Sequence, residues 1–393
     1  MVPKGWSSSQ LGEIMSFKNG LNFTKTDNGD SVKIVGVGDF KDLSELSSTE
    51  HLELISVAGR IRDEELLNNG DLLFVRSNGN KDLIGRCMFF PEVRERLSFS
   101  GFTIRGRVIN ELTFPAYMAI VARSSQFQTQ ISKASGGTNI SNLSQQILND
   151  INLLLPPLIE QKKIAKILST WDKAISVTEK FLANSQQQKK ALMQQLLTGK
   201  KRLLDENGVR FSGEWRNSTL SMFCNIAKGK ALSASDLEVG DFPVIAGGKS
   251  SPYSHSDYTH ENVVTVSASG AYAGYISYHN YKIWASDCSV VSAKADNLID
   301  YFYQLLLSLQ DKIYSLQSGG AQPHIYPKDL NSIPLWVPCV KEQQKIAAVL
   351  SAADVEISTL EKKLACLKDE KKALMQQLLT GKRRVKVDEA VAA

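Results

Sequence analysis

The sequence KKALMQQLLTG occurs at residues 189–199 and returns unchanged at residues 371–381. Eleven identical residues in a row indicate an internal duplication. The match continues upstream at the same offset of 182 residues, where Glu160-Gln161 reappears as Glu342-Gln343. Neither copy has gained or lost a residue along this stretch, so something constrains its length.

A heptad seam explains the constraint, because one inserted residue rotates every later side chain by about 100° away from the seam. Both copies repeat apolar residues at spacings of four and three, which is typical of a long amphipathic helix. Prolines precede the two segments, and Gly199 and Gly381 follow them. The sequence therefore predicts helices over 157–199 and 339–381, each roughly 60 Å long. The apolar seam residues are Ile164, Leu168, Ile175, Leu182, Leu192 and Leu196 in one copy and Ile346, Leu350, Ile357, Leu364, Leu374 and Leu378 in the other.

We expect the two helices to form an antiparallel coiled coil, because a duplicated unit that folds on itself usually closes with pseudo-two-fold symmetry. Lys189 and Lys371 occupy seam positions, and buried polar residues of this kind set the register of such a pair. The alternative is that the helices only hold two domains apart. A spacer of fixed length can itself be a function.

The regions outside the helices are related more distantly. Trp6 returns as Trp215 at an offset of 209 residues, so the second region is a copy shorter by 27 residues. Each region shows short strands and then a helix, which predicts an α+β fold. We expect one domain over 1–156, a second over 200–338 and a tail over 382–393. The expected strands are 32–37, 71–75, 87–90, 102–108 and 151–155 in the first region and 242–246, 263–266, 274–278, 288–292 and 333–337 in the second; the expected helices are 114–132 and 298–317.

Charge is unevenly distributed along the chain. The formal net charge is +5, yet residues 158–202 carry +7 and residues 340–384 carry +4, so the remainder carries −6. A DNA-binding surface on the compact regions must therefore be a local patch. The five cysteines are scattered, no apolar run is long enough to span a membrane, and the N-terminus lacks an apolar signal core. These features predict a cytoplasmic protein without a membrane partner.

Catalytic motifs are absent from the sequence. Gly247-Gly248-Lys249-Ser250 resembles the end of a phosphate-binding loop, but the first glycine of that motif is replaced by Pro243. The five histidines do not form metal-ligand spacings. We expect no catalytic residue, no metal site and no cofactor on this chain.

Polar, glycine-bearing loops follow equivalent strands in the two regions, at 76–81 (RSNGNK) and at 267–272 (SASGAY). Arginine and asparagine can contact guanine and adenine bidentately, while serine, lysine and backbone amides hold phosphates. Any one such loop is more often an ordinary solvated turn, but the matched positions favour recognition. The candidate DNA-contacting residues are Lys18, Asn19, Arg76, Ser77, Asn78, Lys81, Arg86, Thr138 and Asn139 in the first region and Lys228, Lys230, Lys249, Tyr253, His255, Ser267, Ser269, Tyr272 and His324 in the second.

This layout resembles the specificity subunit of type I restriction-modification enzymes. The resemblance covers essentially the whole chain, and it rests on the motif at 156–168 (PPLIEQKKIAKIL), on the repeated helices, and on the segments NGDLLFVRSNG from Asn69, SASGAYAGY from Ser267 and WASDCSV from Trp284. It implies two α/β target-recognition domains, each reading one half of a bipartite double-stranded DNA site, separated by the antiparallel helix pair.

The resemblance further implies that the chain is not an enzyme and that it docks methyltransferase subunits, for which we expect two copies, and restriction subunits through them. S-adenosylmethionine, ATP and Mg²⁺ are then expected on the partner subunits. Two other readings stay open at this stage. One is a coiled-coil scaffold whose two domains bind proteins, which the negative charge of the compact regions favours; the other is a stand-alone modification enzyme, which the missing motifs disfavour.

Overall fold

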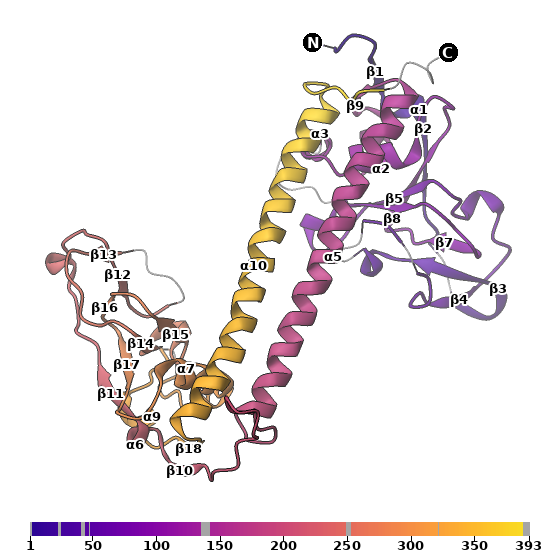
Figure 1. The fold of residues 1–393 in the computed structure, drawn as a ribbon. Coiled ribbons are helices and arrows are strands. Elements are labelled where there is room, and N and C mark those ends of the chain that lie inside the picture. The colour runs from indigo at the N-terminus through magenta and orange to yellow at the C-terminus, as the bar shows by residue number, and fades with distance from the viewer. Residues whose placement is uncertain are drawn as a thin grey trace. The chain divides into compact units, whose positions relative to one another are not determined.

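A computed structural model describes residues 2–22, 25–40, 44–46, 48–134, 142–248, 253–320 and 322–387. The chain forms two compact units (Figure 1). Unit 1 comprises Met1–Val177 and Leu364–Ala393, and unit 2 comprises Thr178–Lys363. Each unit thus contains one domain together with part of each long helix. The unit limits fall within the long helices, because the helix ends pack into the cores of the domains.

The expected long helices are present as α5 (Leu158–Leu196) and α10 (Val340–Leu379). Each is one continuous helix that passes from one compact unit into the other. None of the helices within the described ranges combines the length and the apolar content that a membrane crossing needs.

The first domain is built around a four-stranded antiparallel sheet in the order β2-β8-β5-β6. A three-stranded sheet, β4-β3-β7, and a two-stranded pair, β1-β9, complete it. Its strands are β1 (Ser7–Gln10), β2 (Met15–Asn19), β3 (Lys25–Val35), β4 (Leu54–Val57), β5 (Asp71–Val75), β6 (Cys87–Phe90), β7 (Leu97–Phe99), β8 (Thr103–Val108) and β9 (Asn152–Leu155). Its helices are α1 (Leu11–Ile14), α2 (Pro115–Ala122), α3 (Ser125–Ala134) and α4 (Gln145–Asn149), with 3₁₀ turns η1 (Val37–Asp39), η2 (Asp63–Glu65) and η3 (Lys81–Leu83).

The second domain repeats this plan with sheets β11-β17-β14-β15, β13-β12-β16 and β10-β18. Its strands are β10 (Arg216–Thr219), β11 (Cys224–Lys228), β12 (Phe242–Ile245), β13 (Ser254–His255), β14 (Val263–Ser267), β15 (Ile276–His279), β16 (Trp284–Ala285), β17 (Cys288–Ala293) and β18 (Pro334–Val337). Its helices are α6 (Leu220–Phe223), α7 (Ile299–Ser308), α8 (Gln310–Tyr314) and α9 (Pro327–Asn331), with 3₁₀ turns η4 (Ala234–Asp236) and η5 (Gly270–Tyr272).

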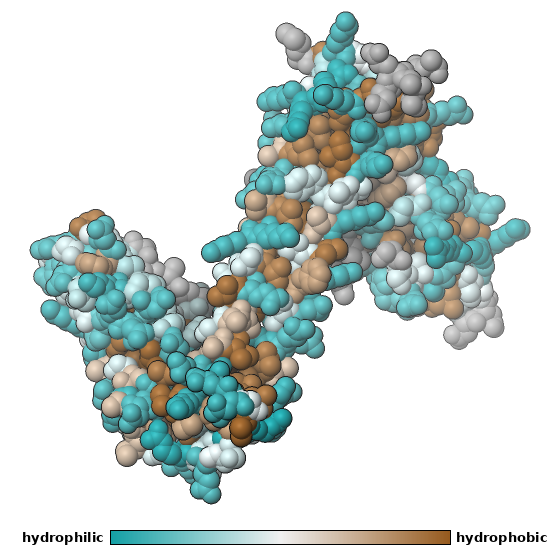
Figure 2. Space-filling view, viewed as in Figure 1, coloured by the Kyte–Doolittle hydropathy of each residue, from teal (hydrophilic) through white to brown (hydrophobic). Residues whose placement is uncertain are grey.

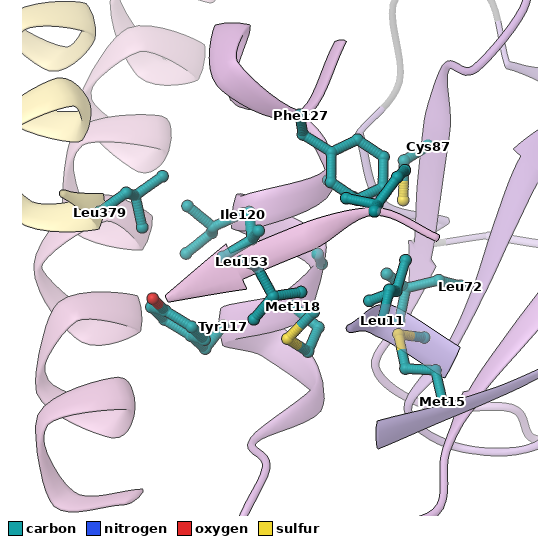
Figure 3. Close-up of a cluster of buried hydrophobic side chains, with 14 of the residues drawn as sticks. Leu11, Met15, Leu72, Cys87, Tyr117, Met118, Ile120, Phe127, Leu153 and Leu379 are labelled. Carbon is teal, nitrogen blue, oxygen red and sulfur yellow. The ribbon is translucent and has the colours of Figure 1, made fainter. Parts of the chain in front are cut away.

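Strand β5 explains how the first domain is layered. All five of its residues are buried, because successive side chains of a strand point to opposite faces and both faces are covered. Leu72 and Phe74 join a cluster with the helices, whereas Leu73 and Val75 join a second cluster with β3 and β7. Figure 3 shows the helical side of this core, where Leu379 of α10 points toward Ile120 and Leu153.

The expected helix 114–132 is divided into α2 and α3. The Ser124 hydroxyl accepts a hydrogen bond from Phe127 N (3.2 Å) and so caps a new helix start. In the second domain the expected helix 298–317 is also divided, at Leu309, into α7 and α8, but no side chain of the described residues caps the start of α8.

The duplication extends to the register of the sheets. Strands β5 and β8 pair Leu72 with Gly106 and Val75 with Thr103. Strands β14 and β17 pair the equivalent residues, Val264 with Val291 and Ser267 with Cys288. The two domains therefore share a backbone framework although their sequences have diverged.

Within each unit the two helix segments run antiparallel. In unit 1, Glu160 of α5 lies beside Arg384 and Asp172 lies beside Lys371, so the order along one segment is reversed along the other (Figure 1). In unit 2, Ser185 donates to Glu356 and Lys189 pairs with Asp354 in the same reversed order. The expected antiparallel orientation holds inside each unit.

Two ion pairs occupy equivalent places on the helices. Lys371 Nζ lies 2.5 Å from Asp172 Oδ1 in unit 1, and Lys189 Nζ lies 2.5 Å from Asp354 Oδ1 in unit 2. Both lysines are the seam residues that we expected to set the register, and each contacts the opposite helix. The fully buried apolar seam residues are those near the helix ends, Ile164, Leu168, Leu196, Ile346, Leu350 and Leu378, while Ile175, Leu182, Leu192, Ile357, Leu364 and Leu374 are half-buried.

The repeated Glu-Gln pair anchors each helix to its domain. Gln161 Oε1 accepts a hydrogen bond from Phe114 N (2.8 Å), and Gln343 Oε1 accepts one from Leu298 N (3.0 Å). Phe114 and Leu298 are the residues just before α2 and α7. The glutamine thus satisfies a free backbone donor at a helix start, which explains why the pair is kept in both copies.

His279 on β15 is expected to make unit 2 sensitive to mild acid. Its ring lies between Thr265 Oγ1 (2.9 Å) and the Tyr281 hydroxyl (3.2 Å), and burial lowers its pKa from the ordinary 6.5 to about 4. Because the folded pKa is depressed, the unfolded chain takes up the proton first, so the stabilisation is present above pH 6.5 and is lost as the pH falls toward 4. The slope should approach about 1 kcal/mol per pH unit.

This prediction can be checked by urea unfolding between pH 7 and pH 4.5. The His279→Asn variant should show a shallower loss of stability than the wild-type chain. The variant His51→Asn, at an exposed histidine of unit 1, provides a control for the loss of one histidine. Equal slopes for the wild-type chain and His279→Asn would show that this histidine is not the titrating group.

Candidate nucleic-acid interface

Three turns meet at one end of the four-stranded sheet in the first domain. They are the turn after β2, the loop at 76–81 after β5, and the turn before β8. Gly20 N donates to Thr103 O (3.0 Å) and Arg76 N donates to Phe102 O (2.8 Å), which ties the three together. The structure thus brings together Lys18, Asn19, Arg76, Ser77 and Asn78, which the sequence had suggested separately.

The loop at 76–81 is held by its own side chains. Asn78 Oδ1 accepts from Asn80 N (2.8 Å), and Asn80 Oδ1 accepts from Asp82 N (3.1 Å). Arg76 Nη1 donates to Gly101 O (3.4 Å). These bonds fix the backbone of the loop before any ligand binds.

A cavity of about 690 Å³ lies beside this loop. Asn78, Ser77 and the exposed ring of Phe102 line one part of it, and Asp39, His51 and Glu53 line another. Lys18 is paired with Glu64 (2.8 Å), and hydrogen bonding to this lysine lowers the pKa of the Glu64 carboxyl. Positive charge at this end of the sheet is therefore partly compensated.

The second domain presents the equivalent three turns. Gly229 N donates to Cys288 O (2.9 Å), and Ala268 N donates to Asp287 O (3.2 Å). Lys228 is exposed, whereas Lys230 lies over the Trp284 ring at 4.8 Å. The exposed Tyr272 belongs to the same end of the sheet.

The residues after β14 contact the chain just before α9. Gly270 N donates to Pro323 O (3.1 Å), and Ser269 and His324 form an isolated bridge. The His324 ring is half-buried and stacks on Tyr326 with a centroid distance of 6.1 Å. His324 therefore lies next to the loop with which the sequence grouped it.

The remaining candidate DNA-contacting residues include buried residues, exposed residues and residues outside the described ranges. His255 is buried, because its ring packs on Trp284 at 4.2 Å and its two nitrogens lie near backbone atoms of Asp236 and Asp257. Ser267 is buried as well. Lys81, Arg86 and Tyr253 are exposed, and Thr138, Asn139 and Lys249 lie outside the described residues.

Sequence reasoning missed two residues at this end of the sheets, Phe102 and Asp287. Each directly precedes a strand, β8 or β17, and each lies beside the loop of its domain. Their equivalence could have been found by aligning the two copies strand by strand, but the low similarity of the domains hid it.

No group of three or more histidine, cysteine or carboxylate side chains within the described part of the chain could hold a metal ion. What the arrangement offers is two equivalent surfaces of polar loops on a shared framework. Such a chain belongs to the class of proteins that recognise a ligand through two related but different domains. Its chemistry suits base edges and phosphates.

The comparisons with known proteins identify the family. The family model described as "Type I restriction modification DNA specificity domain" matches residues 3–184 and 212–368. The chain therefore belongs to this family, and the resemblance found in the sequence is confirmed.

Full-length relatives and solved structures agree with this assignment. The chain is 24% identical to the type I restriction enzyme MjaVIII specificity subunit of Methanocaldococcus jannaschii over 98% of this chain and 94% of that protein. Its fold is similar to the crystal structure of the type I restriction-modification S subunit from M. genitalium, with a TM-score of 0.66, 16% identity and coverage of 95% and 96%. It is also similar to a chain from a structural study of type I complex assembly and conformational transition, with a TM-score of 0.55, 18% identity and coverage of 96% and 98%.

Proposed function

We propose that this chain is the DNA specificity subunit of a type I restriction-modification complex. The observation that carries the proposal is the matched end of the two sheets, where the same backbone framework presents different polar loops. One domain reads one half of a bipartite site and the second reads the other. In this reading the chain itself is not an enzyme, and methylation and cleavage belong to partner subunits.

The helices α5 and α10 supply the other half of the proposal. The two recognition domains are joined by the continuous helices α5 and α10. Continuous helices support a gap of fixed length between the half-sites. For domain-exchange experiments we propose the expected limits. These place the recognition domains at 1–156 and 200–338 and the helices at 157–199 and 339–381.

Unit 1 offers a surface on which a partner could dock. Figure 2 shows hydrophobic surface where the first part of α5 lies beside the last part of α10. A groove of about 810 Å³ there is lined by Ile167, Trp171 and Leu374, with Lys163 and Arg383 at its sides. We assign it to a methyltransferase subunit, and we expect two such subunits, with S-adenosylmethionine on them and with ATP and Mg²⁺ on restriction subunits held through them. The expected cytoplasmic location stays part of this proposal.

Methylation mapping tests the proposal. The chain is expressed together with its cognate methyltransferase subunit, and the host DNA is sequenced for methylated adenines. We expect a bipartite, asymmetric motif with a fixed gap. If the subunits assemble and no motif is found, the protein-binding scaffold replaces DNA recognition as the better explanation.

Exchange of one domain tests whether the half-sites are read separately. Replacing residues 1–156 with a different recognition domain that retains the tryptophan at position 6 should change one half-site and leave the second half-site and the gap as they were. The retained tryptophan keeps its hydrogen bond to Glu160 (3.4 Å). Mapping of methylated adenines reads out the result, and a change in both halves would contradict modular recognition.

A further inference from the structure

Phe102 and Asp287 occupy the same place in the two domains. Each residue stands one position before the second strand in the order of its four-stranded sheet, β8 or β17. The carbonyl oxygen of each accepts the backbone N–H of the residue that follows the neighbouring strand, Arg76 or Ala268. The backbone is therefore equivalent at this position, and only the side chain differs.

The two side chains have opposite chemistry. The side chain of Phe102 is 62% exposed, and Phe102 lines the same cavity as Asn78. A large apolar side chain that stays in solvent next to a polar loop is not explained by core packing. Asp287 is half-buried, and its Oδ2 accepts a hydrogen bond from the hydroxyl of Ser269.

Gly247 packs closely beside the Asp287 carboxylate. An added Cβ at Gly247 would lie 3.0 Å from Ser269 O, 3.5 Å from Asp287 Oδ2 and 3.6 Å from Ser267 Oγ. Ser267 is only 4% exposed, and its hydroxyl has no hydrogen-bond partner among the described residues. A buried hydroxyl without a partner is costly. An unpaired polar group therefore lies in the same small region as the Asp287 carboxylate.

The major groove of DNA supplies groups that match these side chains. A carboxylate accepts hydrogen bonds only, so it binds the exocyclic amino group of cytosine or adenine and repels the acceptor atoms of guanine and thymine. An ionised carboxylate has lone pairs for more than one donor, so the bond from Ser269 leaves capacity for a base. An apolar side chain instead contacts the methyl group of thymine.

We propose that Asp287 and Phe102 are specificity-determining residues at the equivalent position of the two recognition domains, Asp287 selecting a base with an exocyclic amino group and Phe102 selecting thymine. The proposal rests on the proposed function, because it names which side chains of that interface read bases. The shared framework brings the same backbone position to the DNA in both half-sites, and the side chain at that position sets the base.

The test uses the full chain assembled with its methyltransferase subunit and two variants, Asp287→Asn and Phe102→Ser. Methylated motifs are mapped for each, and binding is measured to duplexes in which one base pair of the wild-type motif is changed at a time. Asp287→Asn should reduce discrimination at one position of the half-site read by the second domain by roughly ten- to a hundredfold. Phe102→Ser should do the same at one thymine of the other half-site, so each variant is the control for the other.

A further variant separates base reading from the loss of one negative charge. Asp311→Asn removes an equal charge from the exposed surface of the same domain and should change nothing. If Asp287→Asn and Phe102→Ser assemble and recognise the unaltered wild-type motif, the proposal is wrong while the proposed function stands. A wild-type complex that methylates no bipartite motif would instead overturn the proposed function.

Discussion

Replacing Arg202 with alanine is expected to lower the free energy of unfolding of unit 2 by about 3 kcal/mol, because it leaves a buried carboxylate without its cation. The guanidinium of Arg202 donates from Nε and Nη2 to the two carboxylate oxygens of Glu342, at 2.6 Å and 2.7 Å. Only 1% of the Glu342 side chain is exposed. Trp215 Nε1 also donates to this carboxylate (3.3 Å), but it carries no charge to replace the lost one.

Urea unfolding of the variant and of a neighbouring control, Lys201→Ala, measures this effect. Lys201 is exposed and should be replaceable without loss. Unit 1 contains the same cluster, in which Arg384 pairs with Glu160, and Trp6 stands in the place of Trp215. Arg384 is 40% exposed against 21% for Arg202, so Arg384→Ala should cost less. Equal stability of Arg202→Ala and Lys201→Ala would contradict the argument.

Replacing Gly20 with alanine is expected to destabilise unit 1 by about 2 to 3 kcal/mol and to disturb DNA reading by the first domain. An added Cβ would lie 2.1 Å from Ser100 O and 2.5 Å from Phe99 O. Both are backbone atoms, so the turn before β8 has to move. That turn carries Phe102 and accepts the N–H of Arg76, so its displacement reaches the candidate interface.

Gly38→Ala is a suitable control, because nothing lies within 4 Å of a Cβ at that position. Thermal unfolding compares the two variants, and mapping of methylated adenines in the assembled complex shows whether only the half-site of the first domain is affected. If Gly20→Ala unfolds at the same temperature as Gly38→Ala and its complex methylates the unaltered motif, the prediction is wrong. The backbone at Ser100 and Phe99 would then accommodate the added methyl group without loss of stability.

Much of the framework could be predicted from local sequence. Residues 72–75 are apolar and the run is bounded by turn residues, and it forms β5 within the expected limits of 71–75. The repeated helices were found because their periodicity extends over many turns, which averages out the ambiguity of single residues. The two-stranded pairs were not fully expected, because β1 consists of the polar residues 7–10 and its partner β9 lies far away in the sequence.

The interface was harder to predict for a physical reason. The loops were located by their position after strands, but burial depends on tertiary packing that composition does not reveal. His255 is packed on Trp284, a residue nearly thirty positions away. The anchoring of Glu160 and Glu342 by arginines also depends on long-range contacts, although the repetition of both glutamates was visible in the sequence.

The sharing of helices between the units bears on how such a gene can change. Residues 189–199 belong to unit 2 and the identical residues 371–381 belong to unit 1. An in-frame deletion between these copies removes 182 codons and leaves a chain of 211 residues with one domain and one complete helix. The last part of that helix carries the lysine that pairs with Asp172 in unit 1. In two such chains, the last part of each helix can therefore pack against the first part of the helix of the other chain. We expect the product to be a homodimer of two identical recognition domains, so that under the proposed function a single deletion would convert an asymmetric target into a symmetric one.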